Sequence, residues 1–117
     1  MGKWAEGASG QGAERPTTEG TLTPCGYAQF TSLSAAVSLA TPAAGITLAD
    51  ALAAGARLAV FIAETQAVRW RDDGSDPTGS VGMPLATGAQ WTYPGNLSAI
   101  KFIEQTASAK LNVSYYK

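Results

Sequence analysis

The sequence predicts a single small all-β domain, a sandwich or barrel-like fold of antiparallel strands preceded by an extended N-terminal arm. The 117 residues fit one domain. From about residue 26 onward, short apolar runs alternate with turn residues at the spacing of a sandwich with about seven strands. Residues 1–22 are rich in Gly, Ala, Ser, Thr and Glu, and they contain almost no large apolar side chains. We therefore divide the chain into an arm, residues 1–22, and a β-sandwich domain, residues 23–117.

The strongest strand signal is the apolar run 57–63, bounded by Gly55 and Glu64, whose length and composition are typical of a buried strand. Residues 67–71 alternate, which places Val68 and Trp70 on one face and two arginines on the other. The same argument places Ile100 and Phe102 on one face of 98–104, and Leu111, Val113 and Tyr115 on one face of 110–117. The remaining predicted strands are 27–31, 35–39 and 90–93.

Residues 47–55 depart from the strand pattern. Leu48 and Leu52 have helical spacing, Thr47 followed by Asp50 resembles a capping box, and Gly55 suits the position just after a helix. We expect one short helix near residues 47–54, and the alternative is a turn followed by an extended Ala-rich strand.

The arm has too little apolar surface to fold by itself. Ordering a residue costs about 1–2 kcal/mol of conformational entropy, and after Met1 only Trp4 and Leu22 are large apolar residues that could offset it. We expect the arm to become ordered on a partner subunit, with Trp4 and Leu22 among its contacts.

Composition narrows the function classes. The net charge is −1 and no basic stripe is visible, which argues against direct nucleic-acid binding. The apolar runs are far shorter than the ~20 residues that cross a bilayer, so we expect no membrane association. No secretory signal follows Met1, which predicts synthesis in the cytoplasm. Charged residues make up only 15% of the chain, and a neutral surface favours contact with other protein surfaces.

Catalytic and metal chemistry have few candidate residues. The chain has no histidine and only Cys25, which excludes Cys/His zinc sites and histidine-based triads. We predict a non-enzymatic protein without metal or cofactor, in which Cys25 is a partly buried thiol.

The segment 72–77 carries Asp72, Asp73 and Asp76, which suggests a cation site at first sight. The spacing fails the EF-hand pattern, because neither register supplies the required glycine and glutamate. A polar turn after a strand is the plainer interpretation, with Asp72 or Asp73 paired to Arg69 or Arg71 of this chain or of a neighbour.

The loop 72–88 carries the apolar residues Val81, Met83 and Leu85. A loop of this length in a small domain is usually functional or packed on something. These side chains either plug the end of the sandwich or meet a partner. Four cations, Arg69, Arg71, Lys101 and Lys110, are expected on an outer face, either solvated or paired across a subunit interface.

Residues 66–117 resemble the C-terminal half of a group of small proteins encoded by tailed bacteriophages. The shared elements are VRWRDDG, DPT, VGMPL, the turn Tyr93-Pro94-Gly95, LSAIKFIE and a final AKLNVSYYK. The resemblance implies that this chain is a structural component of the virion. It also implies, as partners, the major capsid protein or other virion proteins, together with copies of the chain itself.

Our leading hypothesis is a capsid decoration (cement) protein that bridges major capsid subunits. One alternative is a structural protein of the tail, the head–tail connector or the base of a fibre. A second alternative is a receptor- or carbohydrate-binding sandwich that uses exposed Trp91, Tyr93 and Tyr116. The candidate partner-interface residues are Trp4, Leu22, Arg69, Arg71, Val81, Met83, Trp91 and Tyr116.

Overall fold

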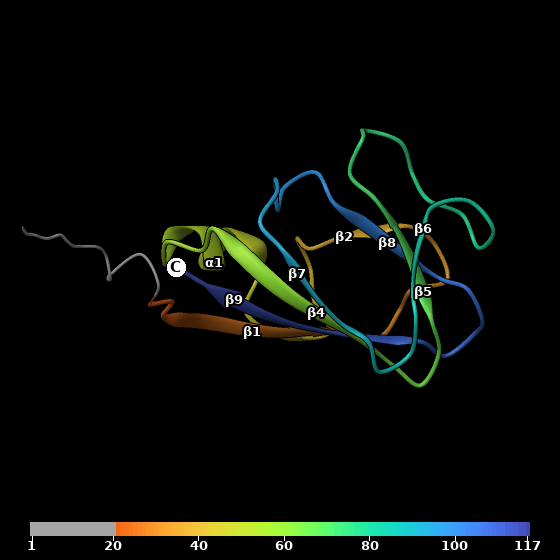
Figure 1. Cartoon of the computed structure of the whole chain (residues 1–117), viewed down its shortest axis with the longest axis horizontal. Helices are drawn as coiled ribbons and strands as arrows, with labels where there is room; N and C mark the ends of the chain where they lie inside the picture. The colour runs from red at the N-terminus through yellow and green to blue at the C-terminus, as the bar shows by residue number, and fades with distance from the viewer. Residues whose placement is uncertain (1–20) are drawn as a thin grey trace, which may run out of the picture.

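A computed structural model describes residues 21–117 (Figure 1). Trp4 and most of the predicted arm lie outside the described residues. Residues 21–117 form nine strands and one helix, arranged as two antiparallel sheets. The predicted all-β sandwich is confirmed.

The five-stranded sheet has the order β3-β1-β9-β4-β7. Its strands are β1 (Pro24–Phe30), β3 (Ala44–Gly45), β4 (Leu58–Glu64), β7 (Gln90–Tyr93) and β9 (Lys110–Tyr116). The four-stranded sheet has the order β2-β8-β5-β6. Its strands are β2 (Val37–Ser38), β5 (Val68–Arg71), β6 (Met83–Leu85) and β8 (Lys101–Glu104).

Strands β3 and β6 are absent from the sequence-based prediction. β3 has two residues, too few to show alternation. β6 has three residues and contains Pro84, which lacks a backbone donor and is normally confined to edge strands. β6 is indeed the last strand of its sheet.

The core lies between the two sheets, and the predicted inward faces are the buried ones. β4 buries Ala59, Phe61 and Ala63, while β8 buries Phe102 against Phe61, with ring centroids 4.8 Å apart. β9 buries Leu111, Val113 and Tyr115. Burial of these side chains is the main stabilisation available to a domain this small.

The helix α1 (Leu48–Ala53) forms as predicted, and the extended alternative is wrong. The Thr47 hydroxyl accepts a hydrogen bond from the Asp50 amide at 3.2 Å, which caps the N-terminus. At the other end Gly55 has φ +98°, and the amides of Gly55 and Ala56 donate to the carbonyls of Leu52 and Ala51, a Schellman motif. No helix within residues 21–117 is long and apolar enough to cross a membrane.

The helix packs at the end of the five-stranded sheet where β1 begins and β9 ends, away from β5 and β6 (Figure 1). Leu48 and Ala51 are buried there. Ile46 approaches Gly26 of β1 so closely that a Cβ at Gly26 would overlap with it. The fold therefore has two distinct ends, one with α1 and both ends of the described chain, the other with β5, β6 and the long loop.

Candidate interaction site

A pair of stacked tryptophans closes the side of the sandwich between β6 and β7. Trp70 of β5 and Trp91 of β7 lie with ring centroids 4.4 Å apart and planes 19° from parallel. Trp91 also contacts Phe61 and Tyr93, at centroid distances of 5.5 Å and 5.1 Å. Aromatic pairs of this kind contribute about 0.5–1.5 kcal/mol beyond their buried area. The pair joins the two sheets at a side where both sheets end.

Two clefts meet at Trp70 and Met83, and we name them together the Trp70 recess. One, of about 480 Å³, lies against the segment after β5 and the chain entering β6. The other, of about 350 Å³, lies between β6 and β7. Their lining residues are Trp70, Arg71, Asp72, Asp73, Gly82, Met83, Pro84, Leu85, Gln90 and Trp91.

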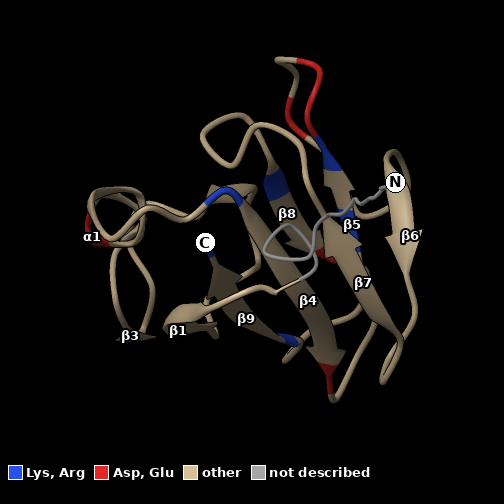
Figure 2. Ribbon diagram, turned by 60° about the vertical axis from the view of Figure 1, so that its left-hand side comes forward, with Lys and Arg blue, Asp and Glu red and all other residues tan. Residues whose placement is uncertain are grey.

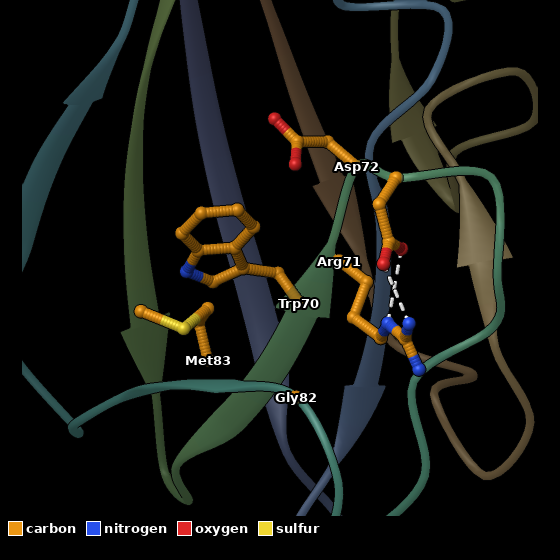
Figure 3. Close-up of a pocket in the computed structure, with 6 residues that line it drawn as sticks. Trp70, Arg71, Asp72, Gly82 and Met83 are labelled. Carbon is orange, nitrogen blue, oxygen red and sulfur yellow. Dashed lines mark hydrogen bonds and ion pairs between the residues drawn. The ribbon is translucent and has the colours of Figure 1, made fainter.

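Apolar side chains stand exposed at the recess. Met83 pairs with Trp70 across β5 and β6, and Figure 3 shows both side chains on the same side of β5, with Arg71 on the other side. Met83 is 57% exposed and Val81, just before β6, is 53% exposed. Leu85, by contrast, is buried in the core. Of the three apolar residues of the long loop, Leu85 therefore packs in the core as one of the two interpretations required, while Val81 and Met83 are exposed to solvent.

Cations of the four-stranded sheet hold the long loop in place. Arg69 donates from Nε to the Gly79 carbonyl at 3.2 Å and from Nη1 to the Gly82 carbonyl at 2.8 Å. The Lys101 ammonium lies 2.8 Å from Asp76 Oδ1. The loop next to the recess is thus fixed from the outer face of its own sheet.

Arg71 pairs with Asp73, its Nε donating to Asp73 Oδ1 at 3.0 Å (Figure 3). This hydrogen bond lowers the pKa of the Asp73 carboxyl and raises the pKa of the Arg71 guanidinium. Asp73 is exposed and Arg71 is partly exposed, so the ion pair contributes little to stability. The predicted pairing of the acidic turn with Arg69 or Arg71 takes this form within the chain.

Tyr93 and Asp72 connect β7 to the end of β5. The Tyr93 hydroxyl donates to Asp72 Oδ2 at 2.7 Å. Burial, together with this hydrogen bond, raises the pKa of Tyr93 to about 12. The phenol therefore stays protonated and keeps its donor role at neutral pH.

The three carboxylates of the acidic turn do not converge. Asp72 accepts from Tyr93, Asp73 pairs with Arg71, and Asp76 pairs with Lys101. Within residues 21–117, no three groups of the kind that hold a metal ion lie together.

The structure brings three of the predicted interface residues to the Trp70 recess, namely Arg71, Met83 and Trp91, and the exposed Val81 precedes the lining residue Gly82 in the chain. Arg69 is directed at its own loop. Leu22 is 41% exposed before β1, and Tyr116 lies on β9 at the α1 end, so neither belongs to the recess. Lys110 pairs with Glu64 across β9 and β4, on the other sheet from the remaining cations.

The alternation in 67–71 places Trp70 on the same face as Val68, a pattern that by itself indicates a core residue. Trp70 packs partly against the core and also lines both clefts. The alternation in 67–71 correctly predicted the face of β5 on which Trp70 lies. The recess, however, also depends on the short edge strand β6, which the sequence did not reveal.

The aromatic residues of the carbohydrate-binding hypothesis are mostly covered. Tyr93 is 5% exposed, and Trp91 is partly buried with one face stacked on Trp70. An aromatic platform for a sugar needs an open ring face, which Tyr93 does not offer.

No family model, no curated protein and no solved structure matches this chain.

Proposed function

We propose that this chain is a non-enzymatic structural protein of a tailed-phage virion, most specifically a capsid decoration protein that bridges subunits of the major capsid protein. It is made in the host cytoplasm and resides in the virion. The resemblance of residues 66–117 supplies the virion context.

The observation that carries the proposal is the pair of exposed apolar side chains, Val81 and Met83, beside the Trp70 recess. Protein interfaces concentrate their energy in a few apolar or aromatic anchors that are seated in pockets and surrounded by a polar rim. Here Met83 and Trp91 line an apolar hollow between β6 and β7, and Arg71 and Asp73 line the adjoining cleft. The loop is held by Arg69, so binding does not have to order it.

Bridging also requires a second attachment. The described chain begins at the α1 end of the sandwich, opposite β5 and β6 (Figure 1). An arm starting from that end and a recess at the other end would contact different neighbours. An extended arm that adds a strand to a neighbour's sheet would gain affinity from main-chain hydrogen bonds.

The tail, connector or fibre-base alternative would use the same two surfaces and differs only in location. The receptor- or carbohydrate-binding alternative uses two aromatic residues of β7, Trp91 and Tyr93. Because Tyr93 is buried, only Trp91 of these two could contact a ligand.

Co-sedimentation of the purified protein with phage capsids tests the recess. We expect Val81→Asp and Met83→Asp to weaken binding at least tenfold, because a carboxylate in an apolar interface loses its hydration without a partner. Leu52→Asp is the matched control, since Leu52 is an apolar residue 43% exposed on α1, at the other end of the fold. Binding of both loop variants at wild-type strength would contradict the role of the recess.

Deletion of residues 2–22 tests the arm in the same assay, with circular dichroism to verify the sheet. We expect the shortened protein to bind more weakly. Wild-type binding by the shortened protein would contradict the bridging role of the arm.

A further inference from the structure

The outer face of the five-stranded sheet carries a column of aliphatic side chains. On β4, Leu58, Val60 and Ile62 point away from the core and stay partly exposed, while the residues between them are fully buried. A sheet face that meets water normally carries polar residues, and a continuous apolar run is typical of a strand covered on both sides. In the described part of the chain, the four-stranded sheet packs against the inner side of β4.

Beside Leu58, Val60 and Ile62, the neighbouring strands carry only uncharged residues on this face. The register places Tyr116 beside Leu58, Ser114 beside Val60, and Asn112 beside Ile62. Further out lie Tyr27 and Gln29 on β1, and Gln90 and Thr92 on β7. The only charged pair in the register of β4 and β9, Glu64 with Lys110, comes at the far end. In Figure 2 the middle of these ribbons is uncoloured and charges appear at their ends.

The polar part of the face is already hydrogen-bonded. Asn112 Oδ1 accepts from the Tyr27 hydroxyl at 2.7 Å and from Gln29 Nε2 at 3.0 Å, and Asn112 Nδ2 donates to Glu64 Oε1 at 2.8 Å. Covering polar groups costs little when their hydrogen bonds are made beforehand. The part of the face around Asn112 can therefore be buried at little cost.

We propose that this face binds the same face of a second copy of the chain, as a symmetric pair of stacked sheets. In such a pair a two-fold axis lies between the sheets, across the strands and through Val60. Val60 then meets Val60 of the second copy, Leu58 meets Ile62, and Tyr116 meets Asn112. Aliphatic groups face aliphatic groups, polar groups face polar groups, and no like charges are brought together.

The occupant is a second copy because the face complements itself. The net charge of −1 produces little repulsion between copies. A charged partner would find no opposite charge in the middle of the face, whereas an identical neutral face matches it row by row.

The size of the face sets the strength of the pair. With strands about 4.8 Å apart and about 3.3 Å per residue, the uncharged rows span roughly 20 Å by 20 Å. Two such faces together bury less than the roughly 1,200–2,000 Å² of a standard specific interface. We therefore expect a weak, reversible pair, formed at high micromolar concentration and favoured wherever copies are held close together.

Sedimentation velocity of the full-length protein from about 5 µM to 1 mM tests the inference. We expect a monomer–dimer equilibrium that Val60→Lys weakens at least tenfold. Ile103→Lys is the matched control, because Ile103 is a partly exposed aliphatic residue on β8 that faces outward on the other sheet, next to Arg69. Thermal melting verifies that both variants are folded. A wild-type protein that remains monomeric at 1 mM, or equal weakening by both substitutions, would overturn the inference.

A mixing experiment tests the register. Since Val60 faces its own copy, Val60→Lys and Val60→Glu proteins should each remain monomeric alone but form a mixed dimer together. Failure of the mixture to associate, when each variant is folded, would overturn the two-fold arrangement. The measurement needs only the purified chain, so its outcome is independent of whether the protein binds a capsid.

Discussion

The Tyr115 hydroxyl is a polar group enclosed by the core. Tyr115 is fully buried on β9, and its hydroxyl has no hydrogen-bond partner within residues 21–117. Burial raises the pKa of its phenol to about 12. An unpaired buried hydroxyl costs about 1–3 kcal/mol, so this side chain combines a large apolar contribution with a local penalty.

Removing that hydroxyl should stabilise the protein. We expect Tyr115→Phe to raise the free energy of unfolding by about 1 kcal/mol, because the ring is kept and the unpaired donor is lost. Tyr93→Phe is the matched comparison. It removes the hydrogen bond to Asp72 and should lower the free energy of unfolding by about 1 kcal/mol. Urea unfolding measures both, and a destabilised Tyr115→Phe protein would show that the hydroxyl has a partner.

The same two tyrosines predict alkaline sensitivity. Both phenols have pKa values near 12 in the folded protein, against about 10 in an unfolded chain. Between these values the unfolded chain loses its protons first, so the free energy of unfolding should be constant up to about pH 10 and fall as the pH rises toward 12. Denaturant titrations at several pH values measure this. The Tyr93→Phe, Tyr115→Phe double variant should lose most of the dependence, and an unchanged profile would contradict the assignment.

At the scale of elements, the long loop depends on Arg69. Its guanidinium bonds two loop carbonyls, whereas Arg71 pairs only with an exposed carboxylate. We expect Arg69→Ala to increase amide hydrogen exchange in residues 74–82 severalfold, because loop opening no longer breaks those bonds. Arg71→Ala should change exchange there much less. Equal effects of the two substitutions would mean that overall charge, and not the carbonyl contacts, holds the loop.

The sequence was sufficient for elements whose side chains follow a period or a cap. The alternation in 67–71 and 110–117 gave the correct inner faces, and the residues that flank α1 gave both of its ends. It was insufficient where backbone atoms decide the outcome. The sequence predicted that Arg69 is a surface cation. Its actual partners are backbone carbonyl groups, which no sequence pattern identifies. β6 was missed because a three-residue strand with a proline has no alternation to detect.

At the scale of the whole molecule, the fold separates three surfaces. The α1 end holds both ends of the described chain, the opposite end holds the Trp70 recess, and the outer face of the five-stranded sheet is neutral and apolar. The sequence suggested that Val81, Met83 and Trp91 were contact residues, but only the folded sheet edges bring Met83 and Trp91 together with Trp70. These surfaces suit a protein that is held by several neighbours at once.

If the proposal is right, a tailed phage encodes this chain, and electron cryo-microscopy of that phage's virions tests the proposal most directly. We predict regularly spaced copies over the outer surface of the head, each with the Trp70 recess against a major capsid subunit and the arm extending to another. Density for the chain confined to the tail would contradict the decoration role, and virions that lack the chain altogether would contradict a virion role of any kind.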